Sequence, residues 1–73
     1  MKESFKEFVT RLSRLDSPAG DLCFGLLRDE YFSFQWGAKR KREYIATLPE
    51  IHGSYLEQSV EDFLIEFDEF YKA

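Results

Sequence analysis

The sequence has little cysteine, histidine, proline or glycine: its 73 residues contain one Cys, one His, two Pro and four Gly. One cysteine excludes an internal disulfide, and one Cys with one His excludes a zinc site with the usual ligand spacing. Long apolar runs are also missing, since none approaches the roughly 18 residues that a membrane span needs. The amino end lacks the apolar core of a signal peptide. We therefore expect a cytoplasmic protein that binds no metal and does not enter a membrane.

Catalytic motifs are equally scarce. The sequence shows no glycine-rich phosphate loop and no nucleophile with a neighbouring base. Cys23 stands among apolar residues without a basic neighbour in sequence, which favours a small core residue over a reactive thiol. His52 is isolated in a turn, with no Ser, Cys or metal-binding cluster beside it. We expect no enzyme, no catalytic residue and no cofactor.

Aromatic residues, in contrast, are abundant. Eight Phe, four Tyr and one Trp make up 18% of the chain. A chain of this length forms one domain, here residues 1–73, and buries only about 60% of its unfolded surface. Because each aromatic ring can bury roughly 150–250 Å², the rings compensate for the small size. This composition excludes a disordered tail.

The clearest periodicity lies in the last stretch, residues 59–71. Its apolar residues recur at offsets of three and four, which is one stripe of an α-helix. Ser59 is expected to cap this helix, with Asp62 in the partner position of a capping box. The stripe would face water in an isolated helix, so the earlier segments are expected to cover it. It consists of Val60, Phe63, Leu64, Phe67, Phe70 and Tyr71.

The rest of the pattern predicts an all-α protein, a compact four-helix bundle. Helices are expected at about residues 4–15, 18–30, 37–48 and 59–72, with a short helical turn at 54–58. Ser4 begins a Ser-x-x-Glu capping box, and Ser17 can cap the second helix with Pro18 at its first position. Pro49 is expected to end the third helix, after which Ile51 packs back on the core.

The segment from Tyr31 to Trp36 is rich in aromatic residues. Phe32, Phe34 and Trp36 alternate, which is typical of a short strand. No second strand is available to pair with it, and an isolated strand is not stable. We therefore prefer a connector that fills the end of the helical core. In the alternative, some rings stay exposed and Trp36 serves as a binding residue.

Charge is distributed unevenly. Residues 1–48 hold nine Lys and Arg against seven Asp and Glu, whereas residues 57–73 hold one Lys against six acids. The acidic last helix can serve solubility alone or can dock on a basic surface of a partner protein. An acidic surface can also mimic nucleic-acid phosphate, as many small phage-encoded inhibitors do. The candidate protein-binding residues are Glu61, Asp62, Glu66 and Trp36.

One dense positive cluster stands at the start of the third helix. Four consecutive residues advance about 400° around a helix, so this cluster does not occupy one face. Positive charge near an amino end also opposes the helix dipole, which indicates a use for it. That use is phosphate contact with DNA or RNA, an acidic protein partner, or solubility. The candidate nucleic-acid contacts are Lys39, Arg40, Lys41 and Arg42, helped by Arg11 or Arg14.

Five short motifs, made mostly of core positions, follow one another along the chain. They are Ser4-Phe5-Lys6-Glu7-Phe8, Asp21-Leu22-Cys23, Asp29-Glu30-Tyr31-Phe32, the group Ile45, Leu48, Ile51 and Tyr55-Leu56, and the group Val60, Phe63-Leu64 and Phe67. With these motifs the chain resembles the YozE SAM-like family of small helical bacterial proteins. The resemblance implies a compact SAM-like fold of four helices and no particular activity. Ser33 stands where the family commonly has Pro, and the segment around Trp36 has no clear counterpart.

Together these features predict a non-enzymatic interaction module that binds a protein through charged helical faces. The alternatives are DNA binding through Lys39 to Arg42, and a small acidic phage-type inhibitor of a nucleic-acid-binding protein. A third class is self-association, because SAM-like folds can assemble head to tail. The basic third helix and the acidic fourth helix would then meet between copies, so we expect a monomer or weak self-association.

Overall fold

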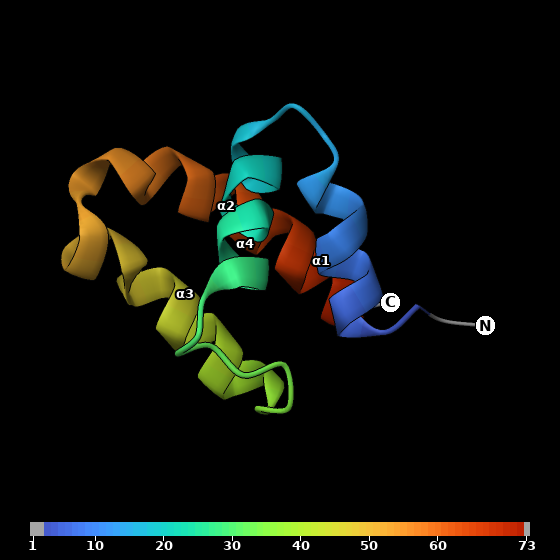
Figure 1. Ribbon diagram of the computed structural model, residues 1–73. Helices are drawn as coiled ribbons and strands as arrows, with labels where there is room; N and C mark the ends of the chain where they lie inside the picture. Colours follow the sequence, from blue (N-terminus) through green and yellow to red (C-terminus); the bar gives the residue numbers. More distant parts are fainter. Residues whose placement is uncertain (1–2, 73) are drawn as a thin grey trace.

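The computed structural model describes residues 3–72, and these residues contain four α-helices, one short 3₁₀ helix and no strand. The elements are α1 (Phe5–Ser13), α2 (Pro18–Arg28), α3 (Ala38–His52), η1 (Ser54–Leu56) and α4 (Glu57–Lys72) (Figure 1). The prediction of an all-α, four-helix protein is confirmed.

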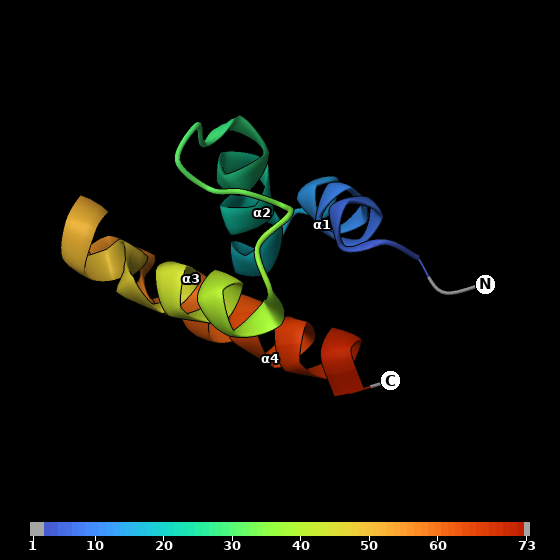
Figure 2. The same ribbon diagram turned by 90° about the horizontal axis from the view of Figure 1, so that it is seen from below.

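The last helix, α4, contacts several of the other elements. In Figure 2, α3 and α4 run antiparallel along one side of the molecule, and α1 and α2 lie on the other. Helix α4 packs against α2, α3 and η1, while α1 packs against α2. The start of α1 also meets the end of α4, where the rings of Phe5 and Tyr71 stack with centroids 5.8 Å apart.

All four α-helices contribute buried residues to the core, and α4 contributes part of its predicted stripe. Val60, Phe63 and Phe67 are buried, and Phe63 has no exposed surface. Rings from other elements surround them: Phe8 of α1 lies 6.0 Å from Phe63, and Phe5 lies edge-on 5.6 Å from Phe67, measured between centroids. Burial of such rings is the main stabilising contribution in so small a domain. The expectation that earlier segments cover this stripe is confirmed for these three residues, whereas Leu64 and Phe70 are partly buried and Tyr71 is exposed.

The first two helices begin as the sequence predicts. The Ser4 side chain accepts a hydrogen bond from the backbone N–H of Glu7, and the Glu7 carboxylate accepts one from the N–H of Ser4. Ser17 caps α2 by accepting from the N–H of Gly20, and Pro18 is the first helical residue. These caps satisfy amides that have no partner within the helix.

Both helices end two residues earlier than expected. The backbone N–H of Leu15 donates to Leu12 in a tight final turn after α1, which leaves the Leu15 side chain exposed. After α2, Asp29 has an extended backbone, and its carboxylate accepts from the N–H of Tyr31. Such a turn competes with helix continuation.

The prediction that Pro49 ends the third helix is wrong. Helix α3 continues through Pro49 to His52. A proline removes one amide donor from the helix, but the carbonyl of Pro49 still accepts from Gly53, so the last turn closes. Gly53 then turns the chain with φ of 133°, a conformation that favours glycine. As a consequence, Ile51 does not pack on the core and is 62% exposed.

The start of α4 also differs from the prediction. The expected turn is present as η1, and its N-cap is Gly53, which has no side chain to make a capping hydrogen bond. Helix α4 follows directly from Glu57, so Ser59 lies inside it and does not cap it. Because η1 already supplies a helical turn, α4 begins without a separate capping residue. Asp62 instead accepts a hydrogen bond from Gln58 one turn earlier.

The aromatic segment is a connector, as preferred from the sequence. Phe32 is buried, whereas Phe34 and Trp36 are partly buried against the core. The ring of Phe32 lies edge-on to both, 5.1 Å from Phe34 and 5.6 Å from Trp36 between centroids. Tyr31 alone of these rings is largely exposed. The connector fills the end of the helical core without forming a strand.

Candidate functional site

The face of α4 that points away from the core carries one large apolar residue. Ile65 lies on the side opposite Val60, Phe63 and Phe67, and 64% of its surface is exposed. The sequence motifs did not single it out. Ile65 could have been found in the sequence from its position between two turns of helix whose outward side chains are all charged.

Four carboxylates surround Ile65. Residues three and four positions away on a helix are neighbours on its surface. For Ile65 all four of these neighbours are acidic. We call Ile65 and these residues the acidic face: they are Glu61, Asp62, Asp68 and Glu69.

Two of the four carboxylates already have partners within the chain. Asp68 accepts two hydrogen bonds from the Arg42 guanidinium, both of 3.0 Å. These bonds hold the pKa of Asp68 below its usual value and raise the pKa of Arg42. Asp62 accepts from the side chain of Gln58 at 3.0 Å. Glu61 and Glu69 are exposed, so the acidic face presents at least these two carboxylates around the isoleucine.

Glu66, the third predicted acidic contact, lies apart from the acidic face. Adjacent positions on a helix diverge by about 100°, so Glu66 projects away from Ile65. Its charge acts on two groups of other helices. It contributes to the raised pKa of Arg11, of which the main cause is the Glu3 partner, and to that of Cys23, of which the main cause is burial. Glu66 therefore lies toward α1 and α2.

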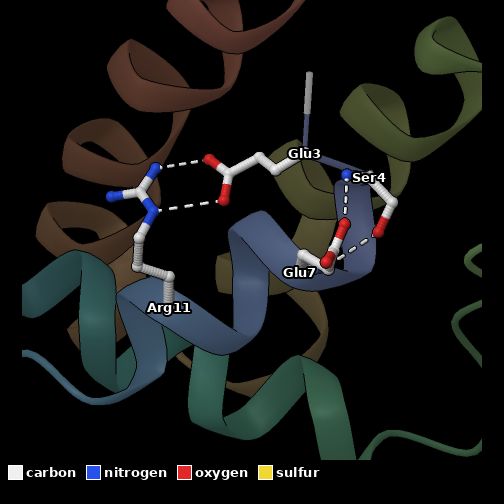
Figure 3. A network of polar contacts seen from close by, with 4 residues as sticks. All are labelled: Glu3, Ser4, Glu7 and Arg11. Carbon is white, nitrogen blue, oxygen red and sulfur yellow. Dashed lines mark hydrogen bonds and ion pairs between the residues drawn. The ribbon is translucent and has the colours of Figure 1, made fainter. Parts of the chain in front are cut away.

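Arg11, a predicted phosphate contact, is paired with a carboxylate. Its guanidinium donates to both oxygens of Glu3, at 2.7 and 3.3 Å, directly beside the capping box of Ser4 and Glu7 (Figure 3). This ion pair raises the pKa of Arg11 and lowers that of Glu3. An incoming phosphate would have to displace Glu3 from this site.

The cluster at the start of α3 is divided among several environments. Lys41 is buried, with 5% of its surface exposed, and Arg42 is paired with Asp68. Arg40 stacks on Trp36, with its guanidinium carbon 4.3 Å from the ring centroid. Lys39 is exposed, as is Arg14, the residue that follows α1. The six predicted positive contacts thus do not form one exposed patch, and Lys41 is the clearest departure from the prediction.

Trp36, predicted either as a core residue or as a binding residue, is half-buried. Its ring lies 5.6 Å from Phe32 and 5.5 Å from Tyr44 between centroids, edge-on to both. The stacked Arg40 covers part of it. Most of its contacts are therefore with the chain itself.

Cys23 and His52 do not come together. Cys23 is fully buried, and burial raises the pKa of its thiol to about 12, so a thiolate is strongly disfavoured. His52 is the exposed last residue of α3. Within residues 3–72, no group of three or more His, Cys, Asp or Glu side chains has an arrangement that could hold a metal ion. In the same part of the chain, no helix combines the length and apolar character that a membrane crossing requires.

No protein-family model, curated protein or solved structure matches this chain. The resemblance to the YozE SAM-like family therefore stays a prediction from the motifs.

Proposed function

We propose that this protein is a non-enzymatic interaction module whose acidic face docks on a partner protein. The observation that carries the proposal is the exposed Ile65 with carboxylates at all four neighbouring helical positions. A solvated helix needs only the charges. A docking helix also needs an apolar side chain to bury, and burial of an isoleucine contributes about 1.5–3 kcal/mol.

The chemistry of the face defines the partner. Glu61 and Glu69 are eight residues apart, which is about 12 Å along the helix axis. A complementary surface would place Lys or Arg at this spacing around an apolar hollow for Ile65. Opposite charges steer the encounter and select the partner, whereas phosphates of nucleic acid are repelled. The single, buried cysteine suits a reducing, cytoplasmic setting.

A partner that itself binds nucleic acid is the second candidate, and the spacing of the carboxylates favours it. Glu61, Asp62, Asp68 and Glu69 follow one side of α4 over about 12 Å, so they can occupy a groove that otherwise takes phosphates. This candidate corresponds to the inhibitor predicted from the sequence. Direct DNA binding has less support, because Arg11, Lys41 and Arg42 are engaged within the chain.

The test is a pull-down from a bacterial lysate with immobilised variants. We expect proteins captured by the unmodified chain to be lost with Ile65→Ser and with Glu61→Lys combined with Glu69→Lys. Ile51→Ser is the matched control, since Ile51 is 62% exposed against 64% for Ile65. Glu30→Lys combined with Glu50→Lys makes the same change in net charge at exposed positions outside the face. Circular dichroism of each variant verifies its helix content.

An identical set of captured proteins for all four variants would rule out the acidic face. A titration with duplex DNA at low salt addresses the nucleic-acid alternative. We expect no binding at tens of micromolar protein. Binding that weakens steeply with salt and disappears when Lys39 and Arg40 become Gln would replace the proposal with DNA binding. If added duplex DNA releases a captured protein, the second candidate, an inhibitor of a nucleic-acid-binding protein, is favoured.

A further inference from the structure

A shallow hollow of about 320 Å³ lies between α2 and the corner where α3 passes into η1. Figure 1 shows the course of these elements. It shares no residue with the acidic face. Its residues come from three helices and the cap of the first: Asp21, Leu22, Gly25 and Leu26 of α2, Asp29 directly after it, Leu48 and His52 of α3, and Tyr55 and Leu56 of η1.

The floor of this hollow is apolar. Leu22, Leu26 and Leu48 belong to the core, and Leu56 packs against it. Tyr55 forms part of the wall and is 77% exposed. The volume is at the lower limit of small-molecule sites, which begin near about 300 Å³. An open hollow of this size suits apolar side chains of a peptide segment.

Gly25 is the residue that leaves the hollow open. An added Cβ at this position would have no heavy atom within 4 Å. At Gly20, in the same helix, an added Cβ would lie 2.2 Å from the carbonyl oxygen of Leu15. Gly20 is therefore required for packing, whereas Gly25 has no packing reason. Glycine inside a helix is less stable than alanine, so its presence at the hollow is explained by the close approach of another molecule.

The charges at the rim are negative. Asp21 lies on α2 one turn before Gly25, and Asp29, the residue that caps the end of α2, follows Gly25 by four positions. Asp29 is held in place, because its carboxylate accepts from the hydroxyl of Tyr44 and from the N–H of Tyr31. None of the described residues that line the hollow is Lys or Arg. The complementary ligand is apolar at its centre and positive on both sides.

We propose that this hollow binds a basic segment of a partner protein, with a large apolar side chain over Gly25 and a Lys or Arg beside Asp21 and beside Asp29. The segment runs along α2 and passes Gly25, where the helix has no side chain, and so its backbone can approach closely. This site is separate from the acidic face, so either can fail without the other.

The probe is a synthetic helical peptide of about four turns, with a central Phe and with Lys one turn before and one turn after it. Backbone amide chemical shifts of the protein, followed by NMR during titration, report where it binds. We expect saturable shifts that centre on Gly25, His52 and Leu56. Two further peptides serve as controls: one replaces Phe with Ser, and one replaces both Lys with Glu. Neither should bind.

Variants locate the site. Gly25→Leu places a side chain in the hollow, where the added Cβ has no heavy atom within 4 Å, and should weaken peptide binding more than tenfold. Ala46→Leu adds the same side chain at an exposed helical position outside the hollow and should leave binding unchanged. Asp21→Asn should weaken binding about two- to fivefold, as loss of an exposed ion pair does. A stable fold in each variant is verified by its dispersed amide spectrum.

The proposal is overturned if the peptide causes no shifts at millimolar concentration, or if Gly25→Leu binds as well as the unmodified protein. Equal binding of the Glu-containing peptide would also reject it, because charge would then have no part. If the same amides shift when the protein alone is concentrated, a second copy of this chain fills the hollow and the basic partner is wrong.

Discussion

The ammonium of Lys41 lies 3.0 Å from the hydroxyl oxygen of Tyr71, a residue thirty positions later in the chain, and donates a hydrogen bond to it. The same ammonium lies 4.1 Å from the centroid of the Phe5 ring. Lys41 thereby joins α3 to the end of α4 and the start of α1. No carboxylate of the described residues forms an ion pair with it. Its positive charge is stabilised by aromatic faces and one hydroxyl.

This environment predicts opposite results for two substitutions of Lys41. Lys41→Met keeps a long apolar stem and removes a buried charge, so the free energy of unfolding should change by less than about 1.5 kcal/mol. Lys41→Glu places a carboxylate against the negative face of an aromatic ring and should destabilise by about 3–5 kcal/mol. Urea denaturation followed by circular dichroism measures both. Equal stability of the two variants would show that Lys41 is not buried in solution.

The core of α4 is tested at two neighbouring positions. Phe63 is fully buried, whereas Leu64 is partly buried at the edge of the core. Phe63→Ala should lower the free energy of unfolding by about 3–5 kcal/mol, which is most of the stability of a domain of this size. Leu64→Ala should lower it by less. Thermal and urea unfolding distinguish them, and a larger loss at Leu64 would contradict the orientation of α4.

The two glycines of α2 should respond to alanine in opposite directions. Gly25→Ala adds a methyl group in open space and should stabilise the protein by about 0.5–1 kcal/mol. Gly20→Ala forces a methyl group against the carbonyl oxygens of Leu15 and Leu12, at 2.2 and 2.7 Å, and should destabilise it. The melting temperatures of both variants give the sign directly. A higher melting temperature for both variants would mean that the end of α1 is not in close contact with Gly20 of α2.

The ionisation of the Tyr44 hydroxyl should make the free energy of unfolding depend on pH in the alkaline range. Burial, together with the 2.5 Å hydrogen bond to Asp29, raises the pKa of Tyr44 to about 12, against about 10 in an unfolded chain. Because the folded state binds this proton more tightly, the contribution is fully present below about pH 10 and is lost as pH rises toward about 12. Tyr44→Phe should remove this dependence and cost about 1 kcal/mol at neutral pH.

The measurement is urea unfolding at several pH values up to about 11, which is within that window. Tyrosinate absorbance should show that Tyr44→Phe removes the most alkaline ionisation step. Tyr55→Phe is the control, since Tyr55 is exposed and is not among the groups that raise the pKa of Tyr44. If both variants keep the dependence of the unmodified protein, the Tyr44–Asp29 bond does not exist in solution.

The features that depend on neighbouring residues could be predicted from the sequence. The caps at Ser4 and Ser17, the start of α2 at Pro18 and the stripe on α4 follow from side-chain hydrogen bonding and from a period of 3.6 residues, which act over a few positions. Cys23 and the connector of Phe32 to Trp36 were also placed correctly. In contrast, the continuation of α3 through Pro49 was not predictable from the residues beside it. It depends on how Gly53 closes the last turn and where Leu48 meets the core.

The sequence by itself determined that this protein is all-α, that α4 carries an apolar stripe and that acidic residues gather in this last helix, because periodicity and composition depend on neighbours along the chain. Only the tertiary structure decided what the charges contact. It buries Lys41, pairs Arg42 with Asp68, and leaves Ile65 and the hollow at Gly25 open. Those outcomes depend on residues far apart in the chain, such as Lys41 and Tyr71, which are thirty positions apart. Distances in space between such residues are fixed by packing and not by their order.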